Sequence, residues 1–304
     1  MRDFILKIND EKEGMRLDVC LFQFFQAQDL GLSRTTIQKE ILEGHVTLAG
    51  AAVKANHKVK PGDAFEIKLG DRKPETIGSE DIPLDIVYED DFLAVINKPC
   101  GLVVHPAPGN KEHTLVNALL HHFKNISQVN PGRPGIVHRL DKDTSGLMLA
   151  VKDDKTHLAL AQLFARHDVK RQYVALVRGS MEFDENIIEV PLGRHPTDRK
   201  KIAAGFGDNT KYAKTHYRTL KRAGSASLIE LTPFTGRTHQ LRVHLAFIGH
   251  PILGDNKYGR KNEFPRLALH AFYIGFIHPA TKKFMEFSTP IPQEFTDFVK
   301  SRPG

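Results

Sequence analysis

The 304-residue chain contains few cysteines: only Cys20 and Cys100 are present, 80 positions apart. No Cys-x-x-Cys pair occurs, and no two histidines have the His-x-x-x-His spacing that places two imidazoles on one helix face. We therefore expect no disulfide and no metal site, and we interpret both cysteines as packing residues in a reducing compartment.

Long apolar runs are also missing from the chain. None approaches the roughly 20 residues that a membrane-spanning helix needs. The N-terminus carries Asp3 and Asp10 and has no apolar segment typical of a signal peptide. These absences predict a cytoplasmic protein that does not interact with a membrane.

Basic charge is plentiful but unevenly distributed. The net charge is +7 for the whole chain, −2 for residues 1–83, +9 for 84–304, and +7 for 194–222 alone. Such a concentration points to a polyanionic partner, although a solvated basic face would explain the charge equally well.

The patterning divides the chain into a domain over 1–70, a polar linker over 71–83 and a domain over 84–304. The first domain is expected to contain strands at 1–9, 45–48 and a pair within 58–68. It also has helical patterns at 19–25 and from the N-cap Ser33 onward. In the second domain we expect strands at 84–88, 93–97, 147–151, 173–177, 215–220, 227–232 and 284–287. We expect helices at 114–123, 155–166, 238–248 and 294–300. Because strands and helices do not alternate strictly, this predicts an α+β fold with a mixed, mostly antiparallel sheet.

The run over residues 135–150 is the most informative segment. It places Asp141 close to Arg139 and Lys142, then continues through a Thr-Ser-Gly turn into a short apolar strand. Nearby positive charge favours the ionised carboxylate, and an ionised Asp on a rigid turn can act as a nucleophile or general base.

Four further segments complete a set of ordered motifs. They cover residues 97–106, 170–177, 235–245, and 269–271 followed by 277–279. Together with 135–150 they resemble the motifs of the RluA-type RNA pseudouridine synthases. The resemblance implies the pseudouridine synthase fold and the isomerisation of uridine in RNA. No cofactor is needed, because that reaction involves neither net redox change nor hydrolysis. The nucleotide must first be flipped out of its stack.

The resemblance also implies roles for individual residues. Asp141 is the catalytic carboxylate, Arg242 pairs with it, Tyr173 stacks on the uracil, and Arg139 helps to displace the flipped nucleotide. Attack on the sugar, addition to the ring and abstraction of a sugar proton all remain open for the carboxylate. Plainer roles are a structural turn aspartate for Asp141, a helix-surface arginine for Arg242 and a core residue for Tyr173. For Arg139 they are a phosphate contact or a surface charge. We interpret His138 and the 97–106 segment as structural.

Two regions are expected to contact RNA. Residues 15–18, 33–34, 38, 41, 44–46 and 60–63 resemble an S4-type RNA-binding domain. Its candidate contacts are Arg16, Arg34, Lys39, Lys54 and Lys58, although for any one of them alone a surface charge is the favoured interpretation. In the second domain, the candidate phosphate contacts are Arg194, Arg199, Lys200 and Lys201.

Among members of the family, the N-terminal domain and residues 104–110 are most similar to those that modify 23S ribosomal RNA. The resemblance thus implies 23S ribosomal RNA, or a large-subunit precursor, as the partner of a monomeric enzyme. One alternative is a noncatalytic RNA-binding or ribosome-assembly factor, against which the presence of Asp141, Tyr173 and Arg242 counts. Another is an Asp-dependent hydrolase unrelated to RNA, against which the basic segment and the S4-like pattern count.

Overall fold

The computed structural model describes residues 2–28, 30, 32, 34–69, 77–107, 109–198, 201–205, 207, 209–260 and 263–302. Its contacts divide the chain into two compact units, Met1–Thr76 and Ile77–Gly304. The segment 77–83, expected to belong to the linker, is part of the second unit. Its attachment is direct, because the backbone N–H of Glu80 donates to the Asn117 carbonyl at 3.0 Å and the Asn117 amide donates to the Gly78 carbonyl at 2.7 Å.

The first unit combines an antiparallel sheet with two α-helices and one turn of 3-10 helix. The sheet has the order β1-β4-β2-β3. The elements are β1 (Arg2–Lys7), η1 (Asp10–Lys12), α1 (Leu17–Ala27), α2 (Arg34–Leu42), β2 (Val46–Leu48), β3 (Ala51–Ala52) and β4 (Ala64–Leu69). The two helices were expected from the apolar spacing, although Ser33 lies outside the described residues. The expected strand pair within 58–68 is wrong, since only β4 forms there.

A buried carboxylate joins α1 to α2 in this unit. The Asp18 side chain is fully buried and accepts hydrogen bonds from Arg16 at 2.9 Å, Arg34 at 2.7 Å and Gln38 at 2.6 Å. Burial alone would raise the pKa of the Asp18 carboxyl, but these donors hold that pKa well below its usual range. Two predicted RNA contacts, Arg16 and Arg34, thus have a structural partner within the unit.

Replacing Asp18 with asparagine is expected to lower the free energy of unfolding of the first unit by about 2 kcal/mol, because it removes charge-assisted hydrogen bonds. A carboxyl with a depressed native pKa contributes stability above its unfolded pKa and loses that contribution as the pH falls. The difference between wild type and variant should therefore shrink below about pH 4. This difference in stability is measured by urea unfolding of the full chain at pH 7 and pH 3, monitored with probes in the first unit. An equal difference at both pH values would contradict the prediction.

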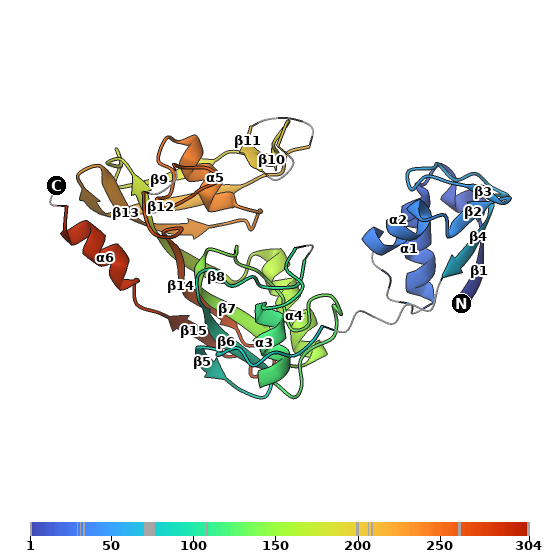
Figure 1. Ribbon diagram of the computed structural model, residues 1–304, viewed down its shortest axis with the longest axis horizontal. Coiled ribbons are helices and arrows are strands. Elements are labelled where there is room, and N and C mark those ends of the chain that lie inside the picture. The colour runs from blue at the N-terminus through green and yellow to red at the C-terminus, as the bar shows by residue number, and fades with distance from the viewer. Residues whose placement is uncertain are drawn as a thin grey trace. The chain divides into compact units, whose positions relative to one another are not determined.

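The second unit is built on a nine-stranded sheet (Figure 1). Its order is β5-β6-β7-β14-β8-β13-β12-β9, and β15 also pairs with β14. The strands of this sheet are β5 (Ile86–Glu89), β6 (Leu93–Lys98), β7 (Ser145–Val151), β8 (Lys170–Arg178), β9 (Glu185–Glu189), β12 (Lys214–Ala223), β13 (Ala226–Pro233), β14 (Leu269–Ile277) and β15 (Phe284–Ser288). Only β7 and β14 pair in parallel, and the other pairs of this sheet are antiparallel. The expected α+β class with a mixed, mostly antiparallel sheet is confirmed.

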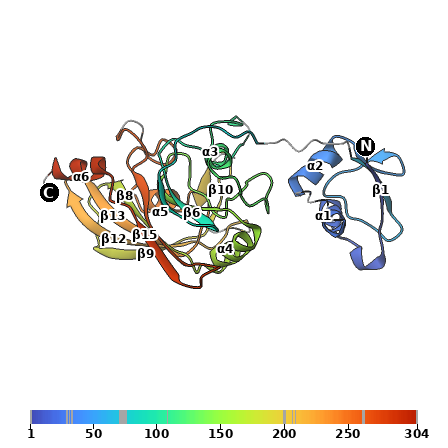
Figure 2. The ribbon, with the colours of Figure 1, turned by 90° about the horizontal axis from the view of Figure 1, so that it is seen from below.

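Four helices accompany this sheet: α3 (Leu115–His122), α4 (Asp154–Arg166), α5 (Gln240–Phe247) and α6 (Gln293–Lys300). Alternate residues of β6 and β7 enter two different cores, one shared with α3 and the other with α4, so both faces of the sheet are covered there. At the other end, α6 lies along β12 and β13 (Figures 1 and 2). The longest helix in the described chain, α4, has 13 residues, and no helix there is long and apolar enough to cross a membrane.

In the second unit, the sequence did not predict β9, β14 or the small hairpin of β10 (Leu192–Arg194) and β11 (Ile202–Ala204). The omission of β14 matters most, because that strand lies at the centre of the sheet between β7 and β8. Its run of apolar residues is typical of a fully buried strand, so a signal was present.

The entry into β7 requires a glycine. Gly146 has a φ of +115°, and a Cβ atom there would lie 2.2 Å from the carbonyl oxygen of Ala271 in β14. No other residue type permits so close an approach of the two backbones. The Thr-Ser-Gly segment was expected to be a turn, but Ser145 and Gly146 already belong to β7, and Gly146 anchors the segment that carries Asp141 to the centre of the sheet.

Candidate active site

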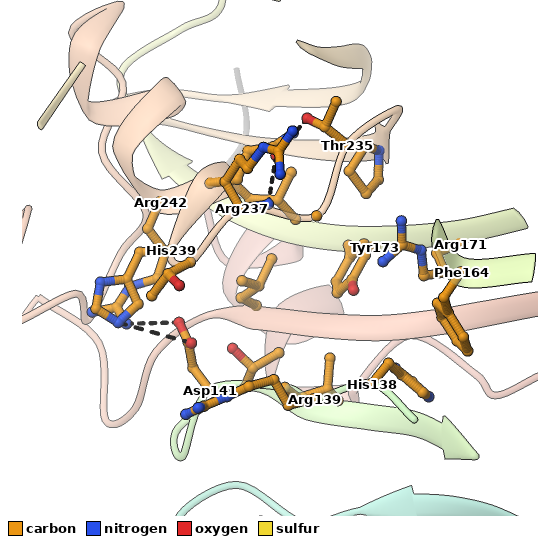
Figure 3. A pocket seen from close by; sticks show the side chains of 18 of the residues that line it. His138, Arg139, Asp141, Phe164, Arg171, Tyr173, Thr235, Arg237, His239 and Arg242 are labelled. Atoms are coloured by element: carbon orange, nitrogen blue, oxygen red, sulfur yellow. Dashed lines mark hydrogen bonds and ion pairs between the residues drawn. The ribbon is translucent and has the colours of Figure 1, made fainter. Parts of the chain in front are cut away.

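An open pocket of about 520 Å³ lies where four of the sequence motifs meet, those at 135–150, 170–177, 235–245 and 269–271. It is lined by the turn before β7, the end of α4, the beginning of β8, the loop after β13 and the first turn of α5. Figure 3 shows Asp141 with Arg242 and His239 on one side, Arg171 with Phe164 on the other, and Tyr173 between them. Residues far apart in the sequence thus form one site.

Asp141 is held through one of its two carboxylate oxygens. Its Oδ2 accepts a hydrogen bond of 2.9 Å from Nη1 of Arg242. Its Oδ1 has no hydrogen bond among the described residues and lies 3.8 Å from Nε2 of His239. The side chain is 22% exposed. The carboxylate is therefore fixed in direction while one oxygen remains available to a molecule in the pocket.

Arg242 is itself fixed by a second carboxylate. Its Nε and Nη2 donate to the two oxygens of the buried Asp255, at 2.7 and 2.8 Å. Burial opposes the charge on Arg242, but the bonds to Asp255 outweigh it and raise the pKa of the guanidinium above its ordinary value. Burial likewise opposes charge on Asp255, and the bonds from Arg242 lower its pKa. The two groups therefore remain a charged pair that orients the third guanidinium nitrogen toward Asp141.

The loop that leads into α5 is held by Gln240. Its side-chain oxygen accepts from the Thr235 hydroxyl at 2.7 Å and from the Arg237 backbone N–H at 3.0 Å. Directly before the helix, His239 has the left-handed φ of 55°, an uncommon conformation for a residue with a side chain. Such conformations occur at functional sites, and here the conformation accompanies an imidazole that faces Asp141.

Tyr173 lies on β8 and lines the pocket. Only 9% of it is exposed, and burial raises the pKa of its hydroxyl. That hydroxyl has no hydrogen-bond partner among the described residues. Two roles were considered for Tyr173, a core residue and a stacking surface. The position is compatible with both, because the ring is packed into the sheet and still borders the cavity.

The opposite wall is formed by Phe164, His138 and Arg171. The imidazole of His138 stacks on the Phe164 ring at 4.5 Å between centroids, and the Arg171 guanidinium lies 5.6 Å from the centroid of that ring. Burial, with a smaller contribution from Arg171, lowers the pKa of His138 to about 3. The neutral ring accepts the N–H of Leu149 at 2.9 Å, which supports the structural role expected for it.

The 97–106 segment supports the turn that carries Asp141. Lys98 is fully buried, and its ammonium donates to the carbonyls of Pro99, Leu102 and Lys142 at 2.8 to 3.0 Å. Burial lowers the pKa of Lys98 to about 8. Because Lys142 follows Asp141, these bonds agree with the scaffold role expected for this segment.

The remaining predicted residues lie at the rim of the pocket or away from it. Arg139 is exposed at the pocket, with no hydrogen bond or ion pair among the described residues. Arg194 lies in β10 and Lys201 directly precedes β11, whereas Arg199 and Lys200 lie outside the described residues. The remaining candidates, Arg16, Arg34, Lys39, Lys54 and Lys58, belong to the first unit.

Among the described residues, one set of side chains has the geometry to hold a metal ion. It consists of Glu40, Glu43 and His45 in the first unit. His45 Nδ1 lies 2.7 Å from a Glu40 oxygen, so the imidazole and this carboxylate already interact with each other. The cluster belongs to the first unit, whereas the pocket is lined by residues of the second.

Comparisons with known proteins give a consistent result. The family model described as RNA pseudouridylate synthase matches residues 92–247. An uncharacterised RNA pseudouridine synthase of Bacillus subtilis is 39% identical over 99% of this chain and 98% of its own length. The ribosomal large subunit pseudouridine synthase D of Zymomonas mobilis is 42% identical over 94% of this chain and 93% of its own.

The fold has solved relatives as well. Human RNA pseudouridylate synthase domain containing 1 has a TM-score of 0.60 and 26% identity, covering 74% of this chain and 98% of that one. Asp255, Tyr258 and Phe164 were not singled out in the sequence, whereas Arg171 and His239 lie within the motifs at 170–177 and 235–245 but were given no role. Only their spatial contacts distinguish these residues from ordinary loop, strand or helix residues.

Proposed function

Because this chain belongs to the RNA pseudouridine synthases of the RluA family, we propose that it converts specific uridines of 23S ribosomal RNA to pseudouridine through the Asp141 carboxylate. The observation that carries the proposal is the Asp141 carboxylate itself, fixed by Arg242 at 2.9 Å with its second oxygen open to the pocket. The relative named for the large ribosomal subunit supports the choice of RNA. The same proposal places the reaction in the cytoplasm.

The reaction breaks the N-glycosidic bond of uridine, turns the uracil and forms a C-glycosidic bond. An ionised carboxylate beside the sugar can act as nucleophile or base in such a step. Arg242 keeps one oxygen of Asp141 in a fixed position, so the free oxygen approaches the nucleotide from a defined direction. Preorganisation of this kind avoids the cost of orienting the group during the reaction.

Tyr173 is proposed to receive the uracil after the nucleotide has left its stack. The cavity of about 520 Å³ is within the range of ligand pockets, roughly 300–1,000 Å³, and accommodates a flipped nucleotide. An aromatic face beside the carboxylate can hold a pyrimidine while it turns. Arg139, which is exposed at the rim and has no hydrogen bond or ion pair among the described residues, is proposed to contact the RNA from which the base was removed.

Basic residues outside the pocket are proposed to bind the RNA backbone. Arg194 and Lys201 lie on the β10–β11 hairpin, in the segment with the highest net positive charge. Contacts of this kind supply affinity and position but little sequence information. The S4-like first unit is proposed as a second RNA-binding surface. We propose a monomeric enzyme, as the resemblance to the family implies.

The proposal is tested by incubating the full chain with unmodified 23S ribosomal RNA and mapping pseudouridine by carbodiimide labelling and primer extension. New stops with the wild-type protein, absent with D141A, are expected. Stops at the same uridines with D141A would overturn the assignment of Asp141. Tight RNA binding without any stops would instead favour the alternative of a noncatalytic RNA-binding or assembly factor.

Replacing Tyr173 with phenylalanine is expected to change the Kd for a target RNA hairpin by less than about twofold, because the ring remains and the hydroxyl has no partner among the described residues. Replacing it with alanine should weaken binding by about 1–3 kcal/mol through loss of stacking. Filter binding at one salt concentration compares the two variants. A large loss with phenylalanine would show that the hydroxyl itself contacts the substrate.

A further inference from the structure

The hydroxyl of Tyr258 lies between the basic hairpin and the pocket. It accepts the backbone N–H of Ile202, the first residue of β11, at 2.9 Å. It also lies 2.7 Å from Nδ1 of His239. One oxygen atom therefore contacts both the strand that follows the proposed RNA-binding loop and the imidazole that faces Asp141.

These two contacts favour one position for the proton of His239. Burial raises the pKa of the Tyr258 hydroxyl, so the group keeps its hydrogen. Among the described residues the hydroxyl has two hydrogen-bond partners, the Ile202 N–H, which can only donate, and Nδ1 of His239, so assigning its single hydrogen to Nδ1 leaves no donor without an acceptor. The neutral imidazole then carries its hydrogen on Nε2, the atom that lies 3.8 Å from Oδ1 of Asp141.

The charge environment of His239 keeps the imidazole neutral. Burial is the main cause of its lowered pKa, and the positive charges of Arg242 and Lys257 add to it. Asp141 and Asp255 act in the opposite direction and do not reverse the shift. A hydrogen bond accepted at Nδ1 favours the same neutral form.

Tyr258 also supports Arg242. The guanidinium lies over the Tyr258 ring, 5.2 Å from its centroid, and the backbone N–H of Tyr258 donates to Asp255 at 3.0 Å. Both groups that face Asp141 thus contact Tyr258, His239 through the hydroxyl and Arg242 through the ring.

The hairpin is packed against the same residue. The side chains of Leu192 in β10 and Val243 in α5 share a small apolar cluster with Ile202 and Tyr258. Lys201, whose carbonyl accepts from His195 across the loop, directly precedes Ile202. The proposed phosphate contacts therefore lie on an element that is bonded to the active site.

We propose that Tyr258 is a positioning residue: its hydroxyl fixes the His239 tautomer that presents N–H to Asp141, and ties strand β11 to that same point. The inference rests on the proposed function, because it assigns the reacting carboxylate to Asp141. It goes beyond that function by naming a residue that sets the geometry without touching the nucleotide.

The test uses the full-length Y258F variant, which removes the hydroxyl and keeps the ring over Arg242. The single-turnover rate constant is expected to fall by about tenfold or more, with the Kd for target RNA within threefold, because partners that orient catalytic groups typically contribute this much. Without the donor at Nδ1, the pKa of His239 rises, so the acid limb of the rate profile moves to higher pH. Y273F, which loses a hydroxyl bond to Glu286 outside the pocket, is the matched control and should retain the rate.

A double-mutant cycle shows whether Tyr258 acts through His239. The variant Y258F/H239N should be no slower than H239N alone if the hydroxyl works through the imidazole. Additive losses, or a Y258F rate within twofold of wild type, would overturn the proposal.

A readout without RNA separates this inference from the proposed function. Nitrogen NMR of the imidazole should show His239 protonated at Nε2 in the wild type and a loss of that preference, with a higher pKa, in Y258F. Identical His239 spectra and titration in both proteins would refute the tautomer assignment whether or not the chain modifies RNA. A changed spectrum in a protein that forms no pseudouridine would uphold the hydrogen bond and reject the proposed function.

Discussion

Replacing Asp141 with asparagine is expected to lower the rate of pseudouridine formation by about 10⁴-fold, with the Kd for RNA changed by less than threefold. Asparagine has nearly the shape of aspartate, and its oxygen still accepts from Arg242. It is neither a nucleophile nor a base, so the chemistry is lost while the architecture of the pocket is kept.

The measurement is single-turnover conversion of a tritium-labelled RNA fragment, together with filter binding and thermal unfolding. Asp143, two residues further along, provides the matched control, because its exposed side chain has no hydrogen bond or ion pair among the described residues. D143N should keep its rate within about twofold. If D141N lost RNA binding or unfolded at a much lower temperature, Asp141 would be a structural residue of the turn.

The sequence predicted the Asp141 turn because its signal is local: charges and turn residues stand next to each other and run into an apolar strand. The partnership with Arg242 was available only through family resemblance, since the two residues are 101 positions apart. The alternative of a helix-surface arginine is excluded, because the Arg242 side chain is 10% exposed and bonded to two carboxylates. Tyr173 similarly could not be assigned to core or pocket until the loop after β13 was placed beside it.

Other residues of the site could not be recognised from the sequence. Asp255 and Tyr258 follow a glycine in a segment between helix and strand, where polar residues are ordinary. Their importance arises from contacts with α5 and β11 that no periodicity predicts. In the first unit the same limitation applied to Arg16 and Arg34, whose charge suggested RNA but whose bonds go to the buried Asp18. Charge and spacing are local properties, whereas the choice of partner depends on the tertiary fold.

Replacing Arg242 with lysine is expected to lower the rate by about 10³-fold and the free energy of unfolding by about 3 kcal/mol. A lysine ammonium cannot reproduce the planar fork that bonds both oxygens of Asp255 and still reaches Asp141. Among the described residues, the buried Asp255 carboxylate would keep the hydrogen bonds from the backbone N–H groups of Lys257 and Tyr258 and lose those from the guanidinium. Both the direction of Asp141 and the stability of the second unit therefore depend on this one guanidinium.

The two effects of R242K can be separated experimentally. Adding D255N removes the uncompensated buried charge, so R242K/D255N should recover most of the lost stability while the rate stays low, because Asp141 is still unsupported. R218K changes an exposed ion pair and should alter stability by less than about 0.5 kcal/mol. Since the lowered pKa of Asp255 contributes stability that is present above its unfolded pKa, the gap between wild type and R242K should narrow as the pH falls below about 4. Recovery of the rate together with the stability would mean that Arg242 serves the fold alone, and that Asp141 acts without its help.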